Sequence, residues 1–189
     1  MGDIELIPRG NLVKISVYEM STGTFVPMLR SLSQILDKAV QQASDKKIDL
    51  AALPNARLAP DMYPLTKQMQ IACDHAKNAT ARLTGQEPPR VADDEQTIDD
   101  LKGRIAKTIE YVQSARPAAF EGAEDRPILF PLIENLVFES NGFEYLRDWA
   151  LPHFYFHVVT AYDILRHNGV DIGKLDYLSH TGVHIHPPD

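Results

Sequence analysis

Apolar side chains recur along several stretches of the chain with the spacing of an α-helix. The first stretch begins at Phe25 and continues at positions i, i+3, i+4 and i+7, through Met28, Leu29, Leu32, Ile35, Leu36, Ala39, Val40 and Ala43. This spacing gives a helix one apolar side. We therefore expect a first helix from Phe25, with Thr22 or Thr24 as its cap, that ends at Ser44.

A second helix is expected over residues 62–83. Asp61 is the expected N-cap, and Pro64 is tolerated in the first turn because its missing N–H would have no partner there. Gly85 marks the end. Many residues of its apolar side are small, so a neighbouring helix can approach closely; that side comprises Leu65, Met69, Ala72, Cys73, Ala76, Ala79 and Leu83.

The third helix is expected to begin at a capping box, Thr97-Ile-Asp-Asp100, with Asp in place of the usual Glu. Its apolar stripe is formed by Ile98, Leu101, Ile105, Ile109 and Val112. Asp100 and Arg104 lie four residues apart, and we expect them to form an ion pair on the solvent side.

The pattern changes between Pro117 and Gly142. Two short apolar runs, 128–131 and 136–138, flank the polar residues 134 and 135, which predicts a small β-hairpin. A fourth helix follows from Asn141, with Glu144 completing a capping arrangement, and ends at Gly169. Pro152 lies inside it, and we expect a kink just before His153 because proline cannot donate to the carbonyl of Asp148.

These elements predict an all-α protein, a four-helix bundle with a small β-hairpin before the last helix. We divide the chain into an N-terminal extension over residues 1–15, a single bundle domain over 16–178 and a C-terminal tail over 179–189. The tail shows no apolar period, and neither does the extension.

Composition excludes several classes of function. The chain has 189 residues and a formal net charge of −7, with no basic run, so neither nucleic acid nor an anionic membrane is an expected partner. No apolar stretch approaches the length of a membrane span. The single cysteine, Cys73, excludes an internal disulfide and fits a reducing compartment. We expect a cytoplasmic protein.

The candidate chemistry lies on the fourth helix. His153 and His157 are four residues apart, so their rings lie on one face and can bind one metal ion. The pair still needs a third ligand from another helix. The alternative is two core histidines that are hydrogen-bonded to backbone or tyrosine.

A third ligand has several candidates. His75 is the only histidine on the first three predicted helices. It lies on the flank of the second helix rather than at the centre of its apolar side. Gln70 and Asp74 are weaker alternatives on the same helix. Tyr145, Tyr155 and Tyr162 are expected to line a pocket, and any one of them could donate to a ligand there. No catalytic residue can be named, and no nucleotide-binding, nucleophile-elbow or Cys-x-x-Cys motif occurs.

The sequence resembles a family of small proteins with a domain of unknown function, related to the DinB/YfiT-like superfamily. The resemblance is carried by Ala56-Arg-Leu-Ala-Pro-Asp-Met62, Gln70-Ile-Ala-Cys-Asp74, Ala81-Arg-Leu-Thr-Gly85, Ala119-Phe-Glu-Gly122 and residues 157–170. Superfamily members are four-helix bundles that commonly hold a divalent metal with one histidine on the second helix and a His-x3-His pair on the last. Members with a metal include thiol-dependent transferases and an isomerase.

The resemblance leaves two hypotheses for function. His153 and His157 match the paired ligands, but the histidine of the second helix would fall near Gln70 or Ile71, and His75 is displaced by about one helical turn. In one hypothesis, the metal site is partial or lost, and a small-molecule pocket remains between helices 2 and 4. In the other, the protein is a divalent-metal enzyme of thiol-transferase or isomerase type that uses Zn, Ni, Fe or Mn. Homodimerisation through helix faces is compatible with both.

Overall fold

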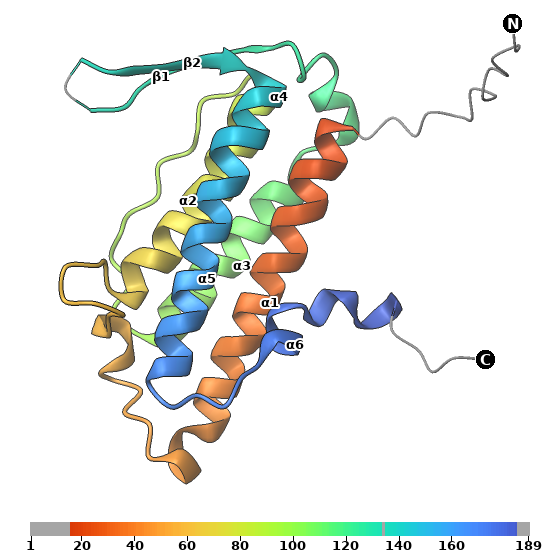
Figure 1. Cartoon of the computed structure of the whole chain (residues 1–189). Coiled ribbons are helices and arrows are strands. Elements are labelled where there is room, and N and C mark those ends of the chain that lie inside the picture. The colour runs from red at the N-terminus through yellow and green to blue at the C-terminus, as the bar shows by residue number, and fades with distance from the viewer. Residues whose placement is uncertain (1–15, 134, 185–189) are drawn as a thin grey trace, which may run out of the picture.

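The protein is a bundle of four long helices with a small hairpin at one end (Figure 1). The computed structural model describes residues 16–133 and 135–184, so the expected extension over 1–15 and the last five residues of the tail lie outside the described residues. The long helices are α1 (Val17–Lys46), α2 (Leu65–Leu83), α3 (Ile98–Ser114) and α5 (Leu151–His167). The predicted all-α bundle with a hairpin before the last helix is confirmed.

The core is built from the apolar sides of the four long helices. The stripes expected from the sequence are buried, and the largest fully buried side chains include Tyr145, Phe25, Phe154, Leu29, Leu32, Met69, Leu101 and Ile105. α2 packs most extensively against α5, because the small residues Ala72, Ala76 and Ala79 let the two backbones approach. Of the described helices, none is long and apolar enough to cross a bilayer.

Helix α1 begins two turns earlier than expected. Ser16 is the N-cap, and its side chain accepts from the backbone N–H of Glu19 while the Glu19 carboxylate accepts from the backbone of Ser16. This capping box satisfies two backbone N–H groups that the start of a helix leaves unpaired. Thr22 is therefore an interior residue of α1 and not a cap.

Helix α2 begins later than expected. It starts at Leu65, and Pro64, in extended conformation, is the residue before it, so the expected cap Asp61 lies outside the helix. The backbone N–H of Leu65 donates to the carbonyl of Ala56, which ties the start of α2 to the connector that carries a short 3-10 helix, Leu53–Asn55. That connector therefore fixes the position at which α2 begins.

The hairpin consists of β1 (Pro127–Pro131) and β2 (Val137–Asn141), antiparallel, with Phe130 opposite Phe138. A short 3-10 helix, Pro117–Phe120, precedes it. Asn141 then caps α4 (Gly142–Glu144), as predicted, by accepting from the N–H of Glu144.

Between α4 and α5 the chain makes a π-helical turn, Tyr145–Ala150. The disturbance expected at Pro152 therefore takes the form of a wider turn in the residues before it, where a proline leaves a carbonyl without its usual donor. This turn sets the rotation at which α5 presents its histidines.

The start of the predicted tail is ordered against α1. After α6 (Lys174–Tyr177), residues Ser179–His184 form a 3-10 helix. The Asp176 carboxylate lies 2.5 Å from Nζ of Lys38, and the hydroxyls of Ser31 and Ser179 are 2.8 Å apart. Polar contacts of this kind leave no apolar period in the sequence, so hydrophobic patterning misses them.

Candidate functional site

The three histidines of the bundle helices meet between α2 and α5. The ring of His75 lies 4.8 Å from that of His153 and 5.9 Å from that of His157, centroid to centroid, with interplanar angles of 23° and 14°. We call these three residues the histidine cluster. His157 is buried, at 9% exposure, as its place on the apolar side predicts. His75 lies at the seam with α5 and not on an open flank, because the small residues of α2 bring α5 close to it.

Oxygen acceptors hold two of the three rings. Nδ1 of His153 lies 2.8 Å from the carbonyl oxygen of Trp149, and Nδ1 of His157 lies 2.6 Å from Oε1 of Gln68. Nε2 of Gln68 donates to the carbonyl of Tyr63, which fixes the orientation of the amide. Since both acceptors are oxygens, each Nδ1 carries the hydrogen, and each Nε2 keeps a lone pair.

Two rings of the cluster, His75 and His157, are electrically neutral in the folded protein. Burial and, after it, the nearby His153, His157 and Arg82 in that order together lower the pKa of His75 from 6.5 to about 3. Burial also lowers the pKa of His157 to about 4, with His153 as the next cause. Removing an imidazolium from water without an anion beside it is unfavourable, so both rings are neutral at physiological pH.

An aromatic group connects the cluster to the hairpin. The indole of Trp149 packs on His153 at 4.3 Å between centroids, and Phe138 of β2 packs on the same indole at 4.8 Å. The guanidinium of Arg82 lies 3.8 Å from the ring centroid of Phe130 and donates to the Tyr145 hydroxyl. Sequence reasoning missed Gln68, Arg82 and Trp149, since no spacing rule links residues on separate elements.

The other predicted pocket residues make their polar and ring contacts elsewhere. Nε2 of Gln70 donates to Glu95, and Asp74 forms ion pairs with Arg104 and Lys77, so both belong to the side of α2 that faces α3. Tyr155 is 38% exposed, and the hydroxyl of Tyr162 donates to the carbonyl of Ile172. The structure therefore brings together the three predicted histidines, and it distributes Gln70, Asp74, Tyr155 and Tyr162 over other surfaces.

The donor chemistry of the cluster fits a transition metal. Neutral imidazoles are common ligands for zinc, nickel, iron and copper, and ligating histidines usually donate their second ring N–H to an oxygen, as His153 and His157 do. The rings lie nearly parallel, however. In the described residues, 16–133 and 135–184, no group of three or more His, Cys, Asp or Glu side chains is placed so that it could hold a metal ion.

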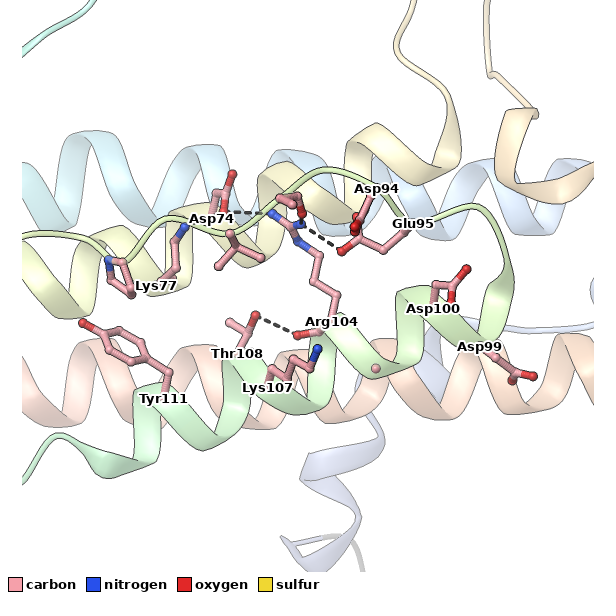
Figure 2. A pocket seen from close by; sticks show the side chains of 14 residues that line it. Asp74, Lys77, Asp94, Glu95, Asp99, Asp100, Arg104, Lys107, Thr108 and Tyr111 are labelled. Carbon is pink, nitrogen blue, oxygen red and sulfur yellow. Dashed lines mark hydrogen bonds and ion pairs between the residues drawn. The ribbon is translucent and has the colours of Figure 1, made fainter.

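A cavity of about 570 Å³ lies on the other side of α2, between α2, α3 and the connector over residues 89–95 (Figure 2). We call it the α3 cavity. Its lining combines charged residues of both signs with a few apolar ones: Asp74, Lys77, Pro89, Val91, Ala92, Asp94, Glu95, Asp99, Asp100, Gly103, Arg104, Lys107, Thr108 and Tyr111. The pocket expected from the sequence was placed between the second and last helices, so this cavity was not predicted.

Arg104 organises one wall of the α3 cavity. Its side chain is 3% exposed, and its guanidinium lies within 3.1 Å of carboxylate oxygens of Asp74, Asp93 and Glu95. It also donates to the backbone carbonyl of Ala92. The predicted solvent-side pair of Asp100 with Arg104 is wrong, because Asp100 completes the capping box with Thr97 while Arg104 turns inward.

Comparisons with known proteins agree with the fold. Residues 17–178 match the model of a family described as "Domain of unknown function (DUF1993)". The chain is similar to a DinB family member protein from Shewanella denitrificans whose crystal structure is known, with 43% sequence identity and a TM-score of 0.79 over 85% of this chain and 90% of that chain. No curated protein matches the chain. The fold expected from the resemblance is therefore confirmed.

Proposed function

This chain belongs to the DUF1993 family and is similar to a DinB family member, and from that premise we propose that its histidine cluster holds a divalent transition metal. The observation that carries the proposal is the meeting of His75 with His153 and His157. His75 supplies the third imidazole that the pair on α5 requires, although it stands about one turn from the position that the superfamily pattern gives. A bound metal would polarise a carbonyl or activate a thiolate or a water.

The surroundings prepare the three side chains for this role. Burial keeps His75 and His157 neutral, and only the neutral ring has a lone pair to offer. The Trp149 carbonyl and the Gln68 amide fix which nitrogen of His153 and His157 is free. Trp149 packs on His153 and limits the access of water to that side of the cluster. An ion would have to draw the three rings into convergence, and this requirement can be tested directly.

The experiment is metal binding by protein purified without a polyhistidine tag. The apoprotein is titrated with Co²⁺ and Zn²⁺, and visible absorption bands of Co²⁺ report the donor atoms. We expect one equivalent to bind, and His75→Ala, His153→Ala and His157→Ala each to weaken binding by at least about tenfold. His167→Ala, an exposed histidine at the end of α5, is the matched control and is expected to bind as the wild type does. Less than about a tenth of an equivalent in the wild type would refute the proposal.

The second candidate function is a metal-free site for a small molecule, and the near-parallel packing of the rings favours it. Two imidazoles already have hydrogen-bond partners, and no metal-binding group is formed in the described residues. The same titration separates the candidates, since a metal-free site binds no Co²⁺ in either wild type or variants. The expected homodimer and cytoplasmic location stay predictions, and sedimentation velocity tests the first of them.

A further inference from the structure

We propose that the α3 cavity binds a small zwitterionic molecule, an amino acid or short peptide with a free amino and a free carboxyl group. This site is separate from the histidine cluster and independent of any metal there. Its volume of about 570 Å³ lies in the range of small-molecule sites. The argument rests on the unpaired donors on one wall of the cavity and on the position of its carboxylates.

One face of α3 lines the cavity with hydrogen-bond donors. Arg104, Lys107, Thr108 and Tyr111 follow one another at i, i+3, i+4 and i+7, so their side chains share that face. Lys77 of α2 lines the cavity opposite them. Figure 2 shows Lys77 and Tyr111 at one end of the view and Asp99 and Asp100 at the other, with Arg104 and Lys107 between them.

Two of these donors line the cavity without an acceptor within the described part of the chain. Arg104 is not one of them: carboxylates and the Ala92 carbonyl engage its terminal nitrogens, and its Nε, which has no hydrogen-bond partner, is covered and out of reach of a ligand. Neither Nζ of Lys107 nor the hydroxyl of Tyr111 forms a hydrogen bond or ion pair with a described residue. Lys107 and Tyr111 lie four residues apart on one face of α3, so one bound acceptor such as a carboxylate can take a hydrogen bond from each.

The opposite end of the cavity carries the charge that an amino group requires. Asp94 and Asp99 are exposed there, beside Asp100 at the start of α3 (Figure 2). Neither Asp94 nor Asp99 forms an ion pair with a described residue through its side chain. A simple anion would meet these carboxylates, and a simple cation would leave Lys107 and Tyr111 without a partner. A ligand that carries both charges satisfies both ends.

The test uses alanyl-alanine and its two blocked forms. Isothermal titration calorimetry of the full chain measures alanyl-alanine, N-acetyl-alanyl-alanine, which is only an anion, and alanyl-alanine amide, which is only a cation. We expect the zwitterion to bind at least about tenfold more tightly than either blocked form, because each lacks one charged hydrogen-bonding group. In NMR spectra, the amide signals of Gly103 and Thr108 are expected to shift, and that of Val158 beside the histidine cluster is not.

Exposed variants test the assignment without disturbing the core. Lys107→Met and Asp99→Asn are each expected to weaken alanyl-alanine binding several-fold, about as much as the loss of one charged partner at a partly open site. Lys174→Met, an exposed lysine on α6, is the matched control and is expected to change nothing. His157→Ala is expected to bind the dipeptide normally, which separates this site from the proposed metal centre. Absence of binding, equal binding of the blocked forms, or NMR shifts elsewhere would overturn the proposal.

Discussion

Two adjacent residues of α2, Asp74 and His75, belong to two different regions of the molecule. Asp74 faces α3 and forms an ion pair with the buried Arg104. His75 faces α5 and packs against two other imidazoles. Both residues are half-buried on the same helix, but one region is a network of charges and the other is a cluster of three imidazole rings.

The difference shows two ways to bury polar groups. On the α3 side, a guanidinium that cannot lose its proton is surrounded by Asp74, Asp93 and Glu95, so its charge is compensated. On the α5 side, no carboxylate of the described residues forms an ion pair with His75 or His157, and these two rings instead lose their protons. The first arrangement stabilises the fold, and the second leaves lone pairs available for chemistry.

Replacing the buried cation is expected to have the largest effect. Arg104→Met leaves Glu95 without its counter-charge, removes one of the two cations that pair with Asp74 and releases the carbonyl of Ala92, so we expect the free energy of unfolding to fall by about 3–5 kcal/mol. Urea unfolding followed by circular dichroism measures it. The control Lys174→Met is expected to stay within about 0.5 kcal/mol of the wild type. A loss below about 1 kcal/mol for Arg104→Met would show that the network is no stronger than surface pairs.

The histidine cluster is expected to make the free energy of unfolding depend on pH. The pKa values of His75 and His157 in the folded protein, about 3 and about 4, lie below the ordinary 6.5. Below pH 6.5 the unfolded chain therefore takes up protons that the folded protein does not, and the free energy of unfolding falls as the pH falls towards 4. Above pH 6.5 these two groups contribute no pH dependence.

For each imidazole, the slope is expected to approach about 1.4 kcal/mol per pH unit once the pH is well below 6.5 and still above the pKa of the folded protein. Unfolding by urea between pH 7 and pH 5, with a chelator present, measures this slope. His75→Gln is expected to remove about half of it, whereas His167→Gln, at an exposed position, is expected to leave it unchanged. A slope that His75→Gln does not alter would mean that the cluster accepts protons as readily as free histidine.

A smaller effect is expected at the amide that holds His157. Gln68→Leu removes the acceptor of the Nδ1 hydrogen and leaves that N–H buried without a partner, which is expected to lower the free energy of unfolding by about 1–3 kcal/mol. If the cluster binds Co²⁺, the same variant is expected to weaken that binding by about 10–100-fold, because the ring loses its fixed orientation. Gln68→Glu keeps an acceptor at this place and serves as the comparison. Equal stability of Gln68→Leu and wild type would show that this hydrogen bond is not needed.

The two regions also differ in how much the sequence reveals. Helical spacing predicts that His153 and His157 share a face, and the apolar arc predicts that His157 is buried. Neither rule gives the position of His75 at the α2–α5 seam, since a helical wheel gives an angle and not the partner helix. On the α3 side, the prediction from the sequence differs more from the structure. The spacing of Asp100 and Arg104 indicated a surface pair, but the acceptors of Arg104 are Asp74, Asp93 and Glu95, on another helix and a connector without periodic signal.

The smallest expected effect sharpens the comparison, because it involves one carboxylate with two partners. Asp93 lies 3.1 Å from the guanidinium of Arg104 and 2.6 Å from Nζ of Lys67. The Lys67 pair is the shorter one, but its side chains are 37% and 38% exposed, so water competes for both charges. Lys67→Met is therefore expected to cost only about 0.2–1 kcal/mol, and the cost is expected to vanish in about 1 M salt, whereas that of Arg104→Met persists. Paired urea titrations at low and high salt measure the cost of both substitutions. The stability of the α3 region is expected to depend on burial of the cation and not on the length of the contact. An equal salt response of the two variants would contradict this expectation.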